Sequence, residues 1–136
     1  MSTIRRFEEL ECWQEARVFV RLVYNLTRNE PFSKDYRLVS QITDSAVSSM
    51  ANIAEGFHRK SNKDFMKFLD YSRASIAETL SHCYVALDQD YINEEELEKL
   101  KTQAELVWKK VNNFIAYLNK TARQNRKAMN PTNPTN

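Results

Sequence analysis

The helical character of this chain is clearest in one stretch, Gln41 to Asn62, which reads QITDSAVSSMANIAEGFHRKSN. On a helix turning about 100° per residue, an arc of apolar and small side chains comprises Leu38, Val39, Ile42, Ala46, Ser49, Met50, Ile53 and Phe57. A polar row beside it comprises Gln41, Ser45, Ser48, Asn52, Glu55 and Arg59. Alternating steps of three and four residues keep this row on one side of the helix. Its short amides and hydroxyls predict close approach of another helix, with hydrogen bonds between side chains.

Gly56 is the only glycine of the chain, and it falls on the apolar arc. It has two structural interpretations: a point of close packing, or a left-handed residue that ends the helix. The residues after it favour a helix end. Ser61 with Asp64 resembles a capping box for the next helix.

Similar periodicity predicts four helices, over residues 10–28, 34–57, 62–88 and from the cap Asn93 to about Thr121, with Ser33 as the cap of the second. The fourth has the most regular apolar seam: Leu97, Leu100, Ala104, Val107, Val111, Phe114 and Leu118. A polar row on the third helix, Tyr71, Ser75, Glu78 and His82, is expected to face the polar row of the second or a symmetry-related copy. Short connections predict an all-α, antiparallel up-down-up-down four-helix bundle.

Length and composition fit this architecture. The 136 residues fit one domain, and one glycine with three prolines argues against a sheet rich in tight turns. We divide the chain into an irregular lead (1–9), the four-helix bundle domain (10–121) and a disordered basic and polar tail (122–136).

The sequence also favours a cytoplasmic location. It has no apolar run of about 18 residues that would span a membrane, and its first residues, MSTIRRFEEL, lack the apolar segment of a secretory signal. Cys12 and Cys83 stand far apart, which favours two reduced thiols over a disulfide or a metal site.

One run of residues resembles a known family signature: Asn52, Ile53, Ala54, Glu55 and Gly56, then Arg59, Ser61, Phe65, Phe68, Leu69, Ser75 and Glu78. Phe7, Leu10, Trp13, Ala16, Tyr24 and Gln41 fit it as well. The chain resembles, over roughly Phe7 to Leu118, the bacterial 23S rRNA intervening-sequence protein family, also called the four helix bundle proteins. It departs from the pattern at His58, Asp64 and Ala74, which affects the expected loop geometry.

This resemblance implies a ring of bundles, because family members form homopentamers. It implies a gene carried within an rRNA intervening sequence, although members also occur elsewhere. It also implies kinship with the accessory proteins of diversity-generating retroelements, which bind a reverse transcriptase and nucleic acid. The family-motif residues, namely Asn52, Ile53, Ala54, Glu55, Gly56, Arg59, Ser61, Ser75 and Glu78, are expected to be structural or to lie in an interface.

Basic residues gather at the turn between the second and third helices, and the candidate nucleic-acid contacts are His58, Arg59, Lys60, Lys63 and Lys67. A second basic segment begins at Leu106, after which there are six basic residues and no acidic one. Lysine and arginine contacts to phosphate supply most non-specific affinity for nucleic acid. The alternative is that the turn is simply a solvated charged surface.

The apolar surface exceeds what one small core can cover, as judged from Trp13, Val20, Tyr24, Trp108 and Tyr117. Aromatic side chains are enriched at interfaces. We therefore expect a homo-oligomer, with a pentameric ring implied by the resemblance.

The sequence pattern indicates neither a catalytic site nor a metal site. No Glu-x-x-His pair of a di-iron bundle occurs, and Glu78 with His82 supplies only part of a metal site. Glu55 requires a partner, for which Arg59 or Arg73 is available. We expect no enzymatic activity, catalytic residue, metal or cofactor.

Three hypotheses remain. The first is a non-enzymatic, self-assembling bundle that binds RNA or DNA or acts as a scaffold. The alternative is a protein-interaction scaffold without nucleic-acid binding. The third is an enzyme or metal protein that uses Glu55, Glu78 and His82.

Overall fold

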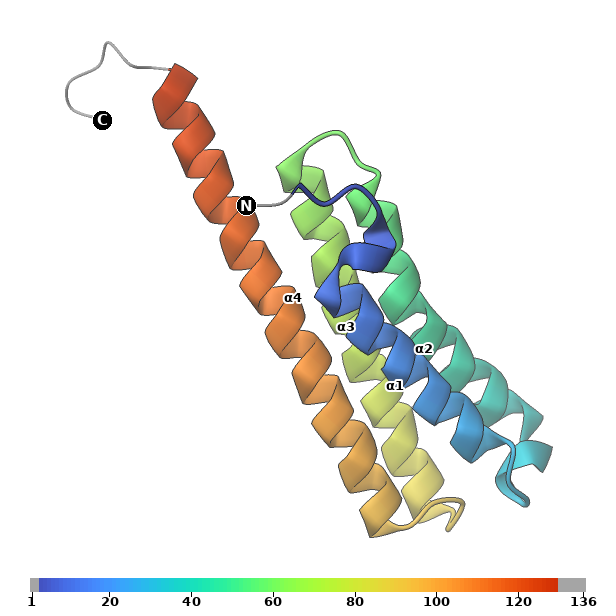
Figure 1. Cartoon of the computed structure of the whole chain (residues 1–136). Coiled ribbons are helices and arrows are strands. Elements are labelled where there is room, and N and C mark those ends of the chain that lie inside the picture. The colour runs from blue at the N-terminus through green and yellow to red at the C-terminus, as the bar shows by residue number, and fades with distance from the viewer. Residues whose placement is uncertain (1–2, 130–136) are drawn as a thin grey trace.

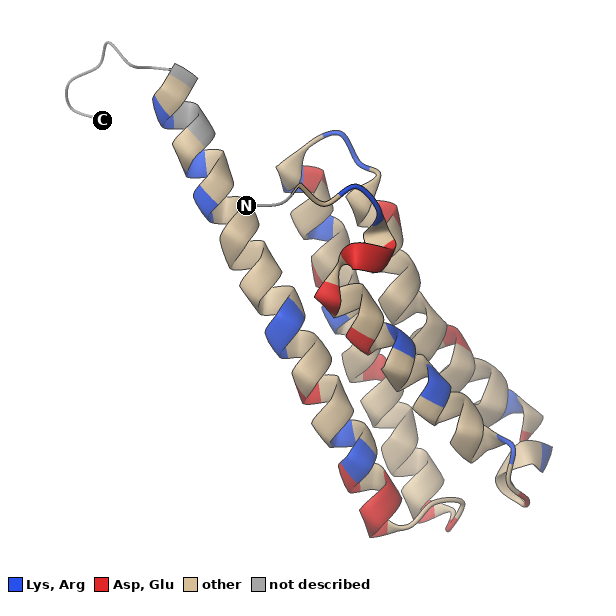
Figure 2. Ribbon diagram, in the orientation of Figure 1, with Lys and Arg blue, Asp and Glu red and all other residues tan. Residues whose placement is uncertain are grey.

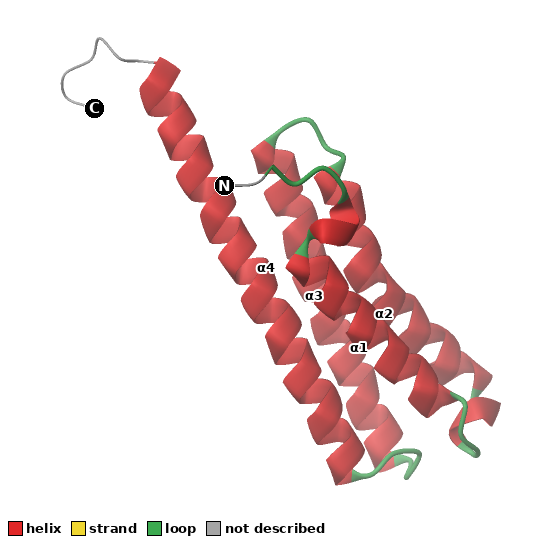
Figure 3. Ribbon diagram, in the orientation of Figure 1, coloured by secondary structure: helices red, strands yellow, loops and turns green. Residues whose placement is uncertain are grey.

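The computed structural model describes residues 3–129, apart from the side chains of residues 125, 126 and 129. Four α-helices account for most of this part of the chain: α1 (Glu11–Thr27), α2 (Tyr36–Phe57), α3 (Asn62–Asp88) and α4 (Glu94–Met129). Two short 3₁₀ helices, η1 (Phe7–Glu9) and η2 (Phe32–Lys34), lie before α1 and α2. Short loops make the remaining connections (Figure 3).

The helices run antiparallel, and each packs against its neighbours in the chain while α4 returns against α1 (Figure 1). The predicted all-α four-helix bundle is therefore confirmed for one chain; the predicted ring concerns several copies and stays a prediction. None of the helices in residues 3–129 combines the length and apolar character needed to cross a membrane.

The core follows the predicted seams closely. On α4 the seam from Leu97 to Val111 is buried, and Leu118 continues it at 5% exposure. On α3 the interior turns slightly away from the prediction: Thr79 and Ala86 are fully buried, whereas Leu80 and Leu87 are only half-buried. A one-residue rotation of this kind reflects the neighbouring helix, because the period alone allows either row.

Helices α2 and α3 have the most extensive contact of any pair. Gly56 is buried at a point where the two helices approach closely. A Cβ placed on it would lie 2.8 Å from Cβ of Phe68, 2.9 Å from Cδ1 of Phe65 and 3.3 Å from the Phe65 carbonyl oxygen. Gly56 does not adopt a positive φ. Gly56 is therefore a point of close packing, and its interpretation as a left-handed helix end is wrong.

Several predicted helix ends need correction. Asp35 caps α2, since its Oδ1 accepts the Leu38 N–H at 3.1 Å, and Ser33 lies in η2 instead. The other predicted caps are found. Ser61 accepts the Asp64 N–H at 3.1 Å, which is one of the two hydrogen bonds of the predicted capping box, and Asn93 forms a complete capping box with Glu96.

The end of α4 was also predicted wrongly. The helix continues past Thr121 to Met129, so the part of the predicted disordered tail that the structure describes is helical. The segment after Thr121 has no glycine or proline before Pro131 and is rich in lysine, arginine, alanine and glutamine, which favour helix. Helix propensity therefore extends α4 without an apolar seam. Residues 130–136 lie outside the described residues.

The Gly56 contact predicts that Gly56→Ala destabilises the protein. Replacing glycine by alanine inside a helix normally gains about 1 kcal/mol, but overpacking costs about 1–3 kcal/mol. Because two of the opposing atoms belong to or adjoin the α3 backbone, we expect a net loss of about 1 kcal/mol in urea denaturation. Ala51→Gly, at an exposed site on α2, measures the difference in helix propensity between alanine and glycine without a packing contribution. A more stable Gly56→Ala protein would contradict the packing argument.

Burial of both cysteines predicts unreactive thiols. Cys12 and Cys83 are free and almost fully buried. Burial raises the pKa of each thiol to about 12 from the ordinary 9.0. Since the thiolate is the reactive form, a thiol reagent at pH 8 should label neither residue in the native protein and both after unfolding in urea. Thr102→Cys, on the exposed side of α4, should label at once. Rapid labelling of the native protein would show that the core opens readily.

Candidate nucleic-acid interface

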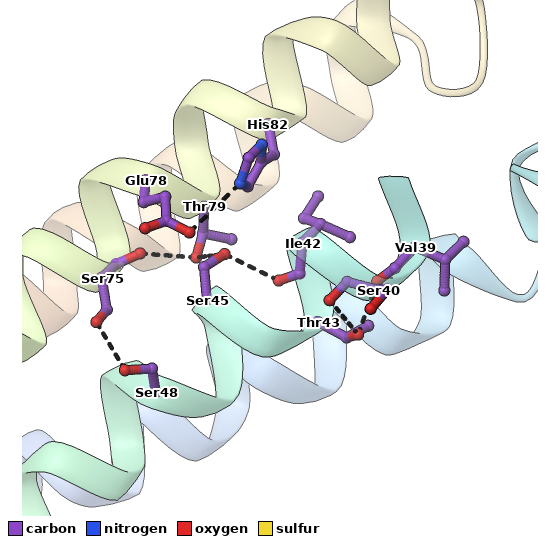
Figure 4. A network of polar contacts seen from close by, with 10 residues as sticks. All are labelled: Val39, Ser40, Ile42, Thr43, Ser45, Ser48, Ser75, Glu78, Thr79 and His82. Atoms are coloured by element: carbon purple, nitrogen blue, oxygen red, sulfur yellow. Dashed lines mark hydrogen bonds and ion pairs between the residues drawn. The ribbon is translucent and has the colours of Figure 1, made fainter. Parts of the chain in front are cut away.

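Much of the family-motif residue set lies between α2 and α3. Ser75 donates a hydrogen bond to Ser48 Oγ at 2.9 Å, and the Asn52 amide donates to the same oxygen at 3.0 Å. One turn away, the hydroxyls of Thr79 and Ser45 are 2.8 Å apart (Figure 4). The predicted meeting of the two polar rows is therefore found only where Ser75 reaches Ser48. Tyr71 and Glu78 of the predicted α3 row are exposed instead, and Thr79, which sequence reasoning missed, makes the other contact, to Ser45.

We call these contacts between Ser45, Ser48, Ser75 and Thr79 the hydroxyl ladder. It continues into the core. Ser72 donates to the Ser49 carbonyl oxygen at 2.6 Å, and both residues are fully buried. In the described residues, every buried side-chain nitrogen or oxygen has a hydrogen-bond partner. Since unpaired buried polar groups are costly, the ladder fixes the register of α2 against α3. Ile53 is buried beside it, and Ala54 is half-buried.

Glu55 has the predicted partner. Its carboxylate lies 3.6 Å from the Arg59 guanidinium, with both side chains substantially exposed. The Arg59 guanidinium also lies 4.4 Å from the centre of the Phe68 ring, a cation–π contact between the end of α2 and α3. The alternative partner is engaged elsewhere, because Arg73 pairs with Asp70 at 2.6 Å and donates to Asn112. Arg59 therefore has a local structural role.

Glu78 and His82 contact each other, with 3.4 Å between Oε2 and Nε2 (Figure 4). The His82 side chain is 20% exposed and that of Glu78 is 62% exposed. Residues 3–129 contain no group of three or more His, Cys, Asp or Glu side chains placed to hold a metal ion. The pair is thus a local contact along one face of α3.

The candidate nucleic-acid contacts lie together at the end of the bundle where α2 turns into α3. His58, Arg59, Lys60, Lys63 and Lys67 are all exposed. Within the described residues, no ion pair engages Lys60, Lys63 or Lys67. Their charges are thus available to a ligand in solution.

The N-terminal lead brings further charge to this end of the bundle. Phe7 packs edge-on against His58 with 6.1 Å between ring centres, and Arg5 and Arg6 precede it on the exposed lead. The backbone N–H groups of Arg5 and Arg6 donate to Glu9 Oε2 at 2.7 and 2.8 Å, and these bonds lower the pKa of Glu9. The lowered pKa means that the contact is present at neutral pH and weakens as the pH falls through that pKa.

We call this set the basic end: Arg5, Arg6, His58, Arg59, Lys60, Lys63 and Lys67. The acidic residues of the α3–α4 loop and of the first turn of α4 lie at the opposite end of the bundle (Figure 2). Sequence reasoning found the turn but missed Arg5 and Arg6, because they join it only through the packing of the lead.

The aromatic residues of the turn are not available for stacking on bases. Phe65 is buried, packing on Phe57 at 6.2 Å and on Phe114 at 5.3 Å between ring centres. Phe57 is half-buried and lies edge-on to His58 at 5.3 Å. The basic end thus presents cations above an aromatic core, an arrangement suited to phosphate groups.

The surplus apolar residues named from sequence are largely accommodated within the chain. Trp13, Val20, Trp108 and Tyr117 are half-buried against the core, and Tyr24 is 39% exposed. Larger exposure occurs elsewhere: Tyr36, Tyr71, Tyr84 and Val85 are each more than two-fifths exposed. Which aromatic residues face outward is decided by helix rotation, and composition does not reveal it.

Comparisons with known proteins agree with this architecture. A model of the family described as 23S rRNA-intervening sequence protein matches residues 8–113. A crystal structure of a protein with unknown function from the S23 ribosomal protein family of Bacteroides thetaiotaomicron VPI-5482 is similar, with a TM-score of 0.68 and 25% identity, covering 76% of this chain and 97% of that one. No curated protein matches significantly in sequence. The chain therefore belongs to the 23S rRNA-intervening sequence protein family.

Proposed function

We propose that this protein is a non-enzymatic module that binds RNA or DNA through its basic end. The supporting observation is that basic residues from the lead, the α2–α3 turn and the first turns of α3 gather at one end, with three lysines that no described ion pair engages. The net charge of the chain is only +2, so the proposal depends on where the charges lie. Acidic residues also lie at this end, but Glu55 is paired with Arg59 and Glu9 accepts hydrogen bonds from the backbone of the lead.

The chemistry of the basic end favours contact with the sugar-phosphate backbone. Its exposed groups are cations that pair with phosphate oxygens, and such contacts position a protein without reading sequence. The aromatic rings beneath it are occupied in packing. Binding through this end is therefore expected to be salt-sensitive and largely independent of base sequence.

Charge reversal tests this proposal. Lys60→Glu, Lys63→Glu and Lys67→Glu together should weaken binding of a labelled random-sequence RNA or DNA at least tenfold in fluorescence anisotropy. Arg59 is left in place because it pairs with Glu55 and packs on Phe68. The matched control is Lys34→Glu, Arg37→Glu and Lys99→Glu, three exposed residues near the opposite end with the same change of charge.

Salt dependence gives a second measure. Wild-type affinity should fall steeply between about 50 and 200 mM salt, as expected when phosphate contacts release counterions. Equal losses in the basic-end and control variants would mean that only net charge matters, and would contradict a localised site. A wild-type protein that binds no nucleic acid would favour the alternative, a scaffold that docks a protein partner.

We propose also that copies of the chain self-associate, with a pentamer as the stoichiometry to test. The specific observation is a charge-poor exposed row on α3, which we call the α3 outer row: Tyr71, Ala74, Glu78, Ser81 and Val85. Tyr71 is 44% and Val85 45% exposed, and Glu78 is the one charged member. A surface helix normally carries charges on its solvent face, so this row suits contact with another chain.

Light scattering coupled to gel filtration tests the self-association. Tyr71→Lys with Val85→Lys should convert an oligomer into a monomer, because charges would enter the contact without disturbing the core. Tyr24→Lys with Tyr36→Lys, at exposed positions on α1 and α2, should leave the oligomer intact. A monomeric wild-type protein, or equal behaviour of the two variants, would contradict the assignment.

A further inference from the structure

The charge on the solvent-facing side of α4 changes from negative to positive along the helix. Glu98 and Glu105 lie on this side in the first half of the helix. From Leu106 onward its charged members are all basic: Lys109, Lys120, Arg123 and Lys127. At 100° per residue, these four fall within an arc of about 60°, and all are exposed. We call them the α4 ridge.

The ridge extends from the bundle along a projecting helix. Around Lys109, α4 is packed in the bundle, because Trp108 donates to the Arg73 carbonyl oxygen and Lys110 pairs with Glu11. The last turns of α4 run on beyond the ends of the other helices (Figure 1). With a rise of 1.5 Å per residue, the ridge is about 27 Å long. Among the described residues, none of its four members takes part in an ion pair.

The composition of the ridge distinguishes between kinds of nucleic acid. The exposed positions between its cations include Asn113 and Ala116 and no aromatic residue. Proteins that hold single strands rely on aromatic platforms on which bases stack. A duplex keeps its bases stacked inside and presents one negative charge per about 1.7 Å of its axis. A straight row of cations without stacking groups therefore fits the backbone of a duplex.

We propose that the α4 ridge is a second phosphate-binding surface, distinct from the basic end, that recognises double-stranded nucleic acid. This inference rests on the proposed function and specifies its ligand. The ridge lies along the duplex backbone and contributes affinity through Lys120, Arg123 and Lys127, while the basic end binds phosphates independently.

Neutralising the projecting part of the ridge tests the inference. The variant is Lys120→Gln, Arg123→Gln and Lys127→Gln, which keeps good helix formers outside the packed bundle. Its matched control is Lys34→Gln, Arg37→Gln and Lys99→Gln. Fluorescence anisotropy would compare labelled duplex DNA, duplex RNA and the corresponding single strands over a range of salt concentrations, and circular dichroism would confirm equal helix content.

We expect wild-type protein to bind duplexes more tightly than single strands, and the ridge variant to lose most of that preference. For duplex DNA the slope of log affinity against log salt should fall by about 0.9 for each contact removed, and the control should match wild type. Comparing duplex RNA with duplex DNA shows which backbone the protein prefers. If the ridge variant loses its preference for duplex over single strand with either nucleic acid, the result supports binding through the α4 ridge.

Two results would overturn the inference while leaving the proposed function intact: unchanged duplex affinity and salt slope in the ridge variant, or wild-type binding of single strands as tight as that of duplexes. If the wild-type protein binds no probe at all, both the proposed function and the ridge are wrong.

Discussion

The approach of α2 to α3 at Gly56 is the constraint on which the rest of the structure depends. A Cβ at this position would lie 2.8 Å from Cβ of Phe68, closer than packed carbon atoms can come. Since the two helices are this close, the side chains between them must be small. Serine, threonine and asparagine meet that requirement and then need hydrogen-bond partners. The hydroxyl ladder provides these partners, as between Ser75 and Ser48.

The close approach of α2 to α3 also shapes the surface at the turn between them. The short turn after Gly56 places Phe65 inside the bundle, and the basic side chains on either side of it point into solvent. Arg59, in the turn, is held by Glu55 near the end of α2 and by Phe68 on α3, so it fixes the turn from outside. Lys60 and Lys63 follow this contact directly, in the turn and in the first turn of α3.

Membership of the family accounts for how the helices pack, but it does not identify what the protein binds. Asn52, Gly56 and Ser75 contact their own bundle in this structure, at the seam between α2 and α3. We infer that this part of the signature describes a way of packing two helices. The charges on which the proposed nucleic-acid binding rests lie outside that seam, on the turn, on the lead and along α4. The seam between α2 and α3 and the surfaces proposed to bind nucleic acid are therefore separate parts of this chain.

The sequence by itself determined the number of helices, most of their core seams and the caps at Ser61 and Asn93, because periodicity and capping depend on residues within one or two turns. It misjudged the end of α4, where helix propensity persists after the apolar seam has stopped. Only the tertiary structure decided that Gly56 is a packing point, that Thr79 rather than Leu80 is buried and that the N-terminal lead packs on the turn through Phe7 and His58. Each of these depends on the distance and rotation between segments far apart in the chain, which no local pattern records.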